Sequence, residues 1–304
     1  MQGGVWEIPA GRTCRINANS LEFDRPILIQ GQGQGSKISC RVSPCFALDK
    51  ESDHRLEISR VAMELVDEGS TLIYSKKTTY SSGQPLRFDN VIFTAMACSG
   101  KFLEIEGGGI QASGVRASGN AFCEQAGKKQ ELDWLSIHQV GESYCQGYNI
   151  TDSDFNNIRS VVRSRAEKWE LAAGLIMTNV RVVWTASVVD VDKFNSIAIT
   201  AGMFDQIPTP FILLNTAPFM LSNSYLGGIP RAGEPLIRGA GISGSWMISL
   251  NGFARYFDPP GKAVDMGLGG SLWEEGNTYG GSITHQRKET SPTIEQSGMG
   301  GKGN

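Results

Sequence analysis

Residues 175–183 read LIMTNVRVV: a β-rich run, a polar Thr-Asn step and a second β-rich run. The same order returns at residues 86–93 (LRFDNVIF), at 219–226 (FMLSNSYL) and, with glycine at the turn, at 242–248 (ISGSWMI). Asparagine tolerates left-handed backbone geometry and bonds its neighbours, so it suits a sharp corner between two strands. We interpret each copy as strand, corner and strand of one repeating coil.

The copies recur at intervals that fit a solenoid. The apolar residues chosen to mark successive coils are Val91, Val115, Phe155, Val180, Ile197, Tyr225, Trp246 and Tyr279. The gaps between them are 24, 40, 25, 17, 28, 21 and 33 residues. Most of these gaps equal one coil of roughly 20–30 residues, and the gap of 40 fits two short coils. The sequence therefore predicts an all-β, elongated parallel β-helix.

The chain divides into one large domain and a tail. Of its 304 residues 37 are glycine, helix-forming stretches are scarce, and no shift in composition separates two domains. Alternation such as Val-Asp-Val-Asp at residues 189–192 places valines inside and aspartates outside a coil. We predict one β-helix domain over residues 1–280 and a C-terminal extension over 281–304 with a flexible Gly-rich end.

Charge and composition exclude several partners. The net charge of −3 gives no electrostatic case for nucleic acid or an anionic membrane surface. No stretch offers about 18 uninterrupted apolar residues, so no membrane insertion is expected. The three histidines lie far apart and no Cys-x-x-Cys pair occurs, so we predict neither a metal site nor a cofactor.

The cysteine positions follow the same period as the coils. Successive cysteines at 14 and 40, 98 and 123, and 123 and 145 are 26, 25 and 22 residues apart. Small reduced thiols stacked at like positions in successive coils are the favoured interpretation over disulfides. The start of the chain lacks the pattern of a secretory signal, so synthesis in the cytosol is expected, or else an excised fragment.

Residues 4–16, GVWEIPAGRTCRI, resemble the opening coil of pectate-lyase-like right-handed β-helix proteins. In that family an apolar strand leads into a Pro-x-Gly turn and a second strand, and Pro9 and Gly11 suit such a turn. Residues 26–33, PILIQGQG, look like the second coil. The resemblance covers roughly residues 4–280 and implies a right-handed, single-stranded parallel β-helix.

Within that superfamily the chain is most similar to bacteriophage tailspike and tail-fibre proteins. The resemblance implies a homotrimer on the virion tail, made in the host cytoplasm, that contacts other tail proteins. It also implies recognition, and in many members cleavage, of bacterial surface polysaccharide. The helix that commonly precedes the first coil is missing here, as is an evident virion-attachment domain. We therefore expect a partner that caps the N-terminal end, or a fragment.

Cleavage of a glycosidic bond by hydrolysis needs two carboxylates about 5–9.5 Å apart. Two i, i+2 pairs supply candidates for catalysis, Asp152 with Asp154 and Asp190 with Asp192. The spacings 19, 18 and 20 in the series Asp133, Asp152, Glu170 and Asp190 favour alignment on one face. The competing interpretation is that these acids are solvated residues at corners.

Aromatic and basic residues near those acids are candidates for sugar contacts. Trp134, Trp169 and Trp184 can stack on a sugar ring, although burial in the core or at a trimer interface competes with that role. Arg163, with Arg159 and Arg165, can reach an acidic sugar or form a solvated basic edge. The run at residues 106–109, EGGG, lacks the Lys-Ser/Thr of a phosphate loop and predicts no phosphate site.

Three functions remain open at this point. The first is a tailspike-type receptor-binding protein that recognises bacterial surface polysaccharide and depolymerises it by acid/base hydrolysis. The second is a non-catalytic structural or adhesive β-helix of a tail fibre. The third is a cellular polysaccharide lyase or hydrolase. Close acidic pairs in a groove favour the first function, a surface without them favours the second, and calcium-dependent activity favours the third.

Overall fold

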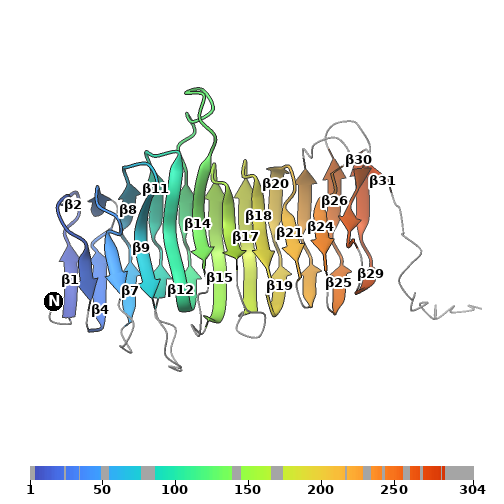
Figure 1. Ribbon diagram of the computed structural model, residues 1–304, viewed down its shortest axis with the longest axis horizontal. Helices are drawn as coiled ribbons and strands as arrows, with labels where there is room; N and C mark the ends of the chain where they lie inside the picture. Colours follow the sequence, from blue (N-terminus) through green and yellow to red (C-terminus); the bar gives the residue numbers. More distant parts are fainter. Residues whose placement is uncertain are drawn as a thin grey trace, which may run out of the picture.

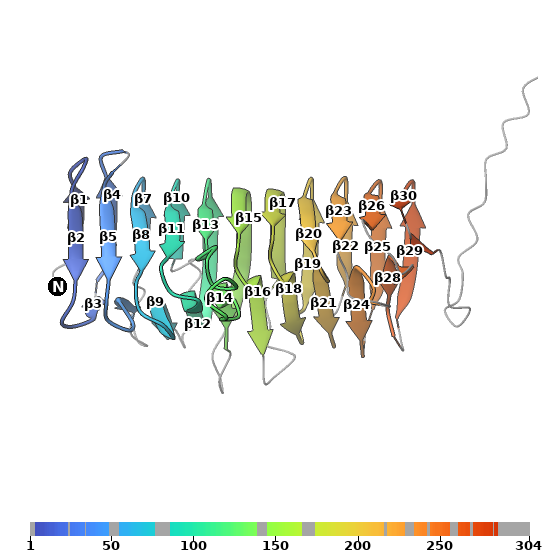
Figure 2. The same ribbon diagram turned by 90° about the horizontal axis from the view of Figure 1, so that it is seen from above.

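The computed structural model describes most of the chain between residues 4 and 284. The residues outside the description are 1–3, 24, 34, 49–54, 77–85, 139–144, 166–173, 216–217, 229–233, 242–243, 256–260, 268–269, 282 and 285–304. The described chain forms strands that stack into an elongated solenoid (Figures 1 and 2). Every strand pairing is parallel, which confirms the predicted parallel β-helix.

The coils place their strands in three columns, and each coil before the last described one contributes to all three. Column A consists of β1 (Gly4–Ile8), β4 (Ile27–Gly31), β7 (Leu56–Ser59), β10 (Leu86–Asp89), the second half of β12 (Ser99–Ser113), the first half of β15 (Cys145–Asn156), the first half of β17 (Gly174–Val183), β19 (Ser196–Thr200), β22 (Phe219–Ser222), β25 (Ser245–Ser249) and β29 (Ser271–Glu275).

Column B follows column A after a one- or two-residue corner in most coils. It consists of β2 (Thr13–Ile16), β5 (Lys37–Cys40), β8 (Ala62–Leu65), β11 (Ile92–Ala95), β13 (Arg116–Ser118), the second halves of β15 and β17, β20 (Met203–Ile207), β23 (Tyr225–Gly228), β26 (Gly252–Arg255) and β30 (Thr278–Gly281).

Column C completes the coil before the chain returns to column A. It consists of β3 (Leu21–Phe23), β6 (Phe46–Leu48), β9 (Ser70–Lys76), the first half of β12, β14 (Glu131–Ile137), β16 (Ser160–Arg165), β18 (Ser187–Asp192), β21 (Phe211–Leu214), β24 (Ile237–Ala240) and β28 (Val264–Asp265). A separate short pair joins β27 (Gly261–Lys262) to β31 (Ile283–Thr284).

Alternation of burial along the strands shows why these sequences form coils. In β4 the residues alternate between buried and half-buried, and in β18 Val189 and Val191 face the core while Asp190 and Asp192 face outward, as predicted. Aromatic rings stack along the interior, for example Phe211, Phe219 and Trp246 with ring centroids 5.7 and 5.3 Å apart. The core therefore forms a continuous column that no single coil could bury alone.

Residues with a left-handed backbone conformation form the corners between strands. Between columns A and B the backbone takes a positive φ at Arg60, Asn90, Gly114, Asp152, Asn179, Ala201, Asn223, Leu250 and Gly276. Asparagine is common among them because it tolerates this conformation at low cost. Directly after this corner, buried polar side chains bond the backbone of the neighbouring coil, as when Asn251 Oδ1 accepts from the Ser224 amide at 2.9 Å. The predicted role of asparagine at corners is confirmed.

The marker residues of the predicted repeat belong to more than one column. Val91, Val115 and Val180 follow the A–B corner, whereas Ile197 and Trp246 lie in column A. Neighbours across coils such as Ile197 and Phe219, or Phe219 and Trp246, are 22 and 27 residues apart, within the predicted range. The prediction of two short coils between Val115 and Phe155 is wrong, because β13 pairs directly with β15 across one long coil.

Two disulfides overturn the prediction of reduced, stacked cysteines. Cys40 bonds Cys45 within one coil, and Cys98 bonds Cys123 in the loop of the next coil, with Cα atoms 5.9 and 5.7 Å apart. Cys14 is free. The sequence period missed the pairs because Cys45 and Cys123 lie in loops, which bring them within bonding distance of a strand end.

Within the described residues, no helix is long and apolar enough to cross a membrane. The same part of the chain holds no group of three or more His, Cys, Asp or Glu side chains that could bind a metal ion.

Candidate functional site

Column C carries an outward row of polar side chains on five successive coils. The register places Tyr74, Glu104, Ser136, Arg163 and Asp190 beside one another on β9, β12, β14, β16 and β18. Neighbouring coils are about 4.8 Å apart, so the row extends roughly 19 Å along the solenoid. We call this row, with Thr71, Lys101, Glu106, Asp133 and Arg159, the column C site.

One end of the site holds two glutamates on β12. Glu104 accepts a hydrogen bond from Thr71 Oγ1 at 2.9 Å and forms an ion pair with Lys101. Glu106 accepts a hydrogen bond from Tyr74 Oη at 2.5 Å. Residues i and i+2 of one strand point to the same side with Cα atoms about 7 Å apart, so the two glutamates are neighbours on the outer face of β12.

The phenol of Tyr74 is held in its protonated form. Burial, and then the hydrogen bond to Glu106, raise the pKa of Tyr74 well above its usual range. The hydroxyl therefore remains a donor to Glu106 at neutral pH. A protonated tyrosine in this position can stabilise the Glu106 carboxylate by its hydrogen bond whenever that glutamate exchanges a proton with a bound sugar.

The middle of the site is organised around Asp133, whose side chain is fully buried. Arg159 binds both of its carboxylate oxygens, and Ser160 Oγ donates to Oδ1 at 2.6 Å. The hydrogen bond to Asp133 raises the pKa of Arg159. A buried carboxylate with these hydrogen bonds holds both its own strand and Arg159 in place.

The other end of the site joins two residues that the sequence singled out. Arg163 Nε lies 3.6 Å from Asp190 Oδ2, and its Nη1 lies 3.8 Å from Asp133 Oδ2. Asp192 lies at the end of the same strand and accepts from Asn215 Nδ2 at 2.9 Å. The structure thus places the predicted Asp190, Asp192 and Arg163 on one face of the molecule.

The predicted pair Asp152 and Asp154 lies elsewhere. Asp152 forms the A–B corner, where Asn179 Nδ2 donates to it at 2.7 Å, and Asp154 lies on column B, 3.2 Å from Arg181 Nη1. Alignment of Asp133, Asp152 and Asp190 on one face is wrong, because a strand and a corner separate Asp152 from column C. Glu170 and Trp169 lie outside the described residues.

The two described tryptophans of the prediction have opposite environments. Trp134 is 0% exposed and packs against Phe93 and Phe155 in the core, so it has no face to offer a sugar and is removed from the candidates. Trp184 is 59% exposed at the B–C corner and donates its indole N–H to Gln206. An alternation of inward and outward residues along β14 could not reveal the burial of Trp134, because residues 132–135 are all buried.

Sequence reasoning missed Tyr74, Lys101, Glu104 and Glu106. A signal was present, because residues 103–106, LEIE, alternate as residues 189–192 do and form a third i, i+2 acidic pair. The phosphate-loop comparison uses only Glu106, as the first residue of a glycine run, and does not use Glu104. That run is in fact the continuous passage of β12 from column C to column A.

No protein-family model matches the sequence, and no curated protein matches it significantly. Among solved structures it is similar to a mannuronic acid-specific polysaccharide family 6 lyase from human gut microbiota, with a TM-score of 0.41 and 10% identity over 93% of this chain and 83% of that chain. It is also similar to the A-module of the Azotobacter vinelandii mannuronan C-5 epimerase AlgE6, with a TM-score of 0.45 and 10% identity over 92% and 91% of the two chains. Likeness at this level does not bear on function. The fold and the site define a parallel β-solenoid with a polar, ion-paired face.

Proposed function

We propose that this protein binds an extended bacterial surface polysaccharide along the column C site and cleaves it by acid/base hydrolysis. The observation that carries the proposal is the in-register row of donors and acceptors on five coils. A row about 19 Å long matches an extended polymer with many hydroxyl groups better than a compact ligand. Glu104 on β12 lies in that row, and Glu106 lies two residues further along the same strand.

In this proposal Glu104 and Glu106 divide the chemistry between them. Glu104, oriented by Thr71 and Lys101, accepts a proton from the attacking water. Glu106, in its protonated form, gives its proton to the glycosidic oxygen as the bond from that oxygen to the anomeric carbon breaks. Tyr74 keeps its own proton and donates a hydrogen bond to the Glu106 carboxylate that is left. The water oxygen forms the new bond to that carbon, so the products are two shorter sugar chains.

A specific observation supports a second candidate, a non-catalytic adhesive solenoid. Glu104, Asp133 and Asp190 each lie beside a cation, namely Lys101, Arg159 and Arg163. Carboxylates engaged in this way can fix side chains that only bind hydroxyl groups. Binding without cleavage would then be the whole function.

The biological setting proposed here is that of a tailspike-type receptor-binding protein on a virion tail. The disulfides fit a protein that acts outside the cytosol, because such bonds persist in oxidising surroundings. They fit a secreted polysaccharide lyase or hydrolase as well, and that remains the third candidate.

The test is the size of surface polysaccharides from a panel of bacteria, followed by gel filtration after incubation with the protein. We expect one strain's polysaccharide to shrink. Glu106→Gln should slow that cleavage about 10²–10⁴-fold, as loss of a general acid or base does. Asp154→Asn, on column B, is the matched control and should keep full activity.

Each of the other outcomes supports a different function or a different catalytic residue. Co-elution of protein and polysaccharide without a change in size supports the adhesive solenoid. Cleavage that requires calcium supports a lyase. Equal activity of Glu106→Gln and Asp154→Asn would remove the β12 glutamates from the mechanism, and loss of activity in Asp190→Asn alone would move the centre to β18.

A further inference from the structure

Exposed side chains gather along the corner between columns B and C. On successive coils Met96, Asn157, Trp184 and Gln206 lie at this corner, and Phe122 lies in the loop that leaves the corner between β13 and β14. We call these five residues the corner row; Asn157 and Gln206 are half-buried. Met96 is 62% exposed, Phe122 67% and Trp184 59%. Large exposed apolar side chains that lie next to one another along one edge indicate an interaction surface more often than they arise by chance.

Trp184 is fixed in position despite its exposure. The backbone φ of Trp184 is positive, at 51°. Asn157 and Gln206, on the coils before and after it, also have a positive φ. Its indole N–H donates to Gln206 Oε1, so the ring is tied to the next coil. A bulky residue seldom takes this conformation, whereas asparagine takes it readily. Backbone preference therefore does not account for a tryptophan at this corner.

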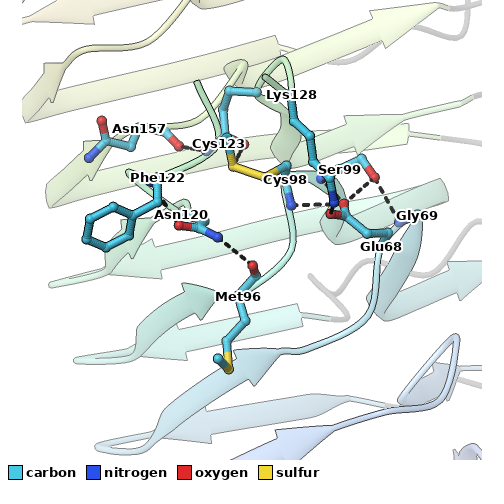
Figure 3. The surroundings of a disulfide bond; sticks show 11 residues. Glu68, Gly69, Met96, Cys98, Ser99, Asn120, Phe122, Cys123, Lys128 and Asn157 are labelled. Atoms are coloured by element: carbon cyan, nitrogen blue, oxygen red, sulfur yellow. Dashed lines mark hydrogen bonds and ion pairs between the residues drawn. A yellow bond between two sulfur atoms is a disulfide. The ribbon is translucent and has the colours of Figure 1, made fainter. Parts of the chain in front are cut away.

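The backbone at Phe122 is held by different means (Figure 3). It lies in the loop between β13 and β14, one residue before Cys123, whose disulfide to Cys98 holds the loop to the start of β12. The Phe122 amide donates to Asn120 Oδ1 at 3.0 Å, and Asn120 Nδ2 donates to the carbonyl of Met96 at 2.7 Å. The phenyl ring points away from the disulfide in the figure.

The composition of the corner row selects its ligand. It alternates aromatic rings at Phe122 and Trp184 with the amide side chains Asn157 and Gln206. Aromatic faces pack on the C–H faces of pyranose rings, and amides bond sugar hydroxyls. Phe122 and Trp184 belong to coils two rungs apart, about 10 Å along the solenoid. The row borders the start of column C, where the strands of the column C site begin.

We propose that the corner row is a second carbohydrate subsite, on which two pyranose rings of the same polymer stack on Phe122 and Trp184. This inference rests on the proposed function, because it assigns the polymer a second contact. The subsite binds and orients the polymer beside the column C site and takes no part in bond cleavage. It therefore affects the dissociation constant of the polymer and leaves the chemistry of short fragments unchanged.

A matched control exists on another edge. Leu250 is also 59% exposed and also has a positive φ, of 55°, but it lies at the A–B corner. Trp184→Asn and Leu250→Asn therefore each replace an equally exposed apolar side chain at a residue with a left-handed backbone conformation. Asparagine suits both positions, so neither variant should lose thermal stability.

The experiment is affinity electrophoresis in native gels that contain capsular polysaccharide or O-antigen purified from the bacterial panel. We expect Trp184→Asn and Phe122→Ala each to raise the dissociation constant about three- to tenfold, and the double variant to raise it further. Leu250→Asn should bind as the unaltered protein does.

The outcomes separate the two proposals. If the unaltered protein binds and all variants bind equally, the subsite is wrong and the proposed function stands. If the unaltered protein binds none of the polysaccharides, the proposed function falls and the subsite with it. If Trp184→Asn changes the mass of the protein in light scattering, the corner row is a contact between copies of the chain, which also overturns the subsite.

Discussion

At the scale of single residues, burial decides what each acid does. Asp133 has no exposed surface and is satisfied by Arg159 and Ser160, whereas Asp154 is 36% exposed and has a looser pairing with Arg181. Both are aspartates on strands with an arginine nearby. A carboxylate removed from water depends on its partners far more than one that water can solvate.

We expect Asp133→Asn to lower the free energy of unfolding by about 3 kcal/mol, because it leaves Arg159 without its charge partner. Asp154→Asn should lower it by less than about 1 kcal/mol. Urea unfolding of the two variants measures the difference. Equal destabilisation would show that Asp133 is not an anchor.

Glu68 gives a prediction about pH. The hydrogen bond from Lys128, with further bonds from Ser99 and Cys98, lowers the pKa of Glu68 to about 2 against the effect of burial. Since the folded pKa lies below the unfolded value, this stabilisation is complete above about pH 4.5 and is lost as the pH falls towards 2. The side chain is 45% exposed, so solvent screening limits the effect to about 1 kcal/mol.

The measurement is thermal unfolding of Glu68→Gln and the unaltered protein at pH 7 and at pH 2.5. At pH 7 the variant should melt at the lower temperature, and at pH 2.5 the gap should narrow. A gap that stays constant across this range would contradict the assignment.

At the scale of elements, the long coil from β13 to β15 shows how the solenoid accommodates an insertion. The strands keep their register, and the additional residues leave the stack as the loop before β14, which projects beyond its neighbours in Figure 1. The Cys98–Cys123 disulfide, the Glu68–Lys128 ion pair at 2.7 Å and the bond from Gln130 to the carbonyl of Asn157 attach this loop to three coils.

Replacement of Cys98 and Cys123 by alanine should lower the free energy of unfolding by about 3 kcal/mol, because the bond closes a chain segment of 25 residues. Replacement of Cys40 and Cys45, only five residues apart, should cost about 2 kcal/mol. Urea unfolding of both double variants under oxidising conditions compares the two bonds. If the corner row binds sugar as proposed, the first variant should also weaken polysaccharide binding.

At the scale of the whole molecule, the strands of each coil pair with those of the coils on either side, and the loop before β14 reaches one coil further, where Lys128 pairs with Glu68. The strand ladder runs without interruption from β1 to β30, and the aromatic interior follows it. A molecule of this kind presents long rows of side chains at a constant spacing along its faces and along the corners between them. The column C site and the corner row are two such rows.

The resemblance to tailspikes predicts a homotrimer, and the oligomeric state tests it. Light scattering on the purified protein should give three times the mass of one chain. A mass equal to one chain would weaken the assignment to a virion tail. It would leave the polysaccharide proposal in place, because all residues of the column C site come from one chain.

The sequence by itself determined the kind of coil. Alternating side chains at residues 189–192 and asparagine at corners such as Asn90 and Asn179 are local features, because they depend on the two-residue period of a strand and on the backbone of one residue. Those features sufficed for the parallel β-helix, for its coil of 20–30 residues and for the outward direction of Asp190 and Asp192.

The tertiary structure alone decided which residues meet. Whether an acid lies on column B or column C depends on the corners before it. Residues at similar spacings in sequence can therefore lie on different faces, as Asp133 and Asp152 do. The Cys98–Cys123 bond and the burial of Trp134 depend on a loop and on neighbouring coils. The meeting of Tyr74 with Glu106 depends on register between β9 and β12, 32 residues apart. Such contacts are set by the length of the loops between strands, which a local pattern does not encode.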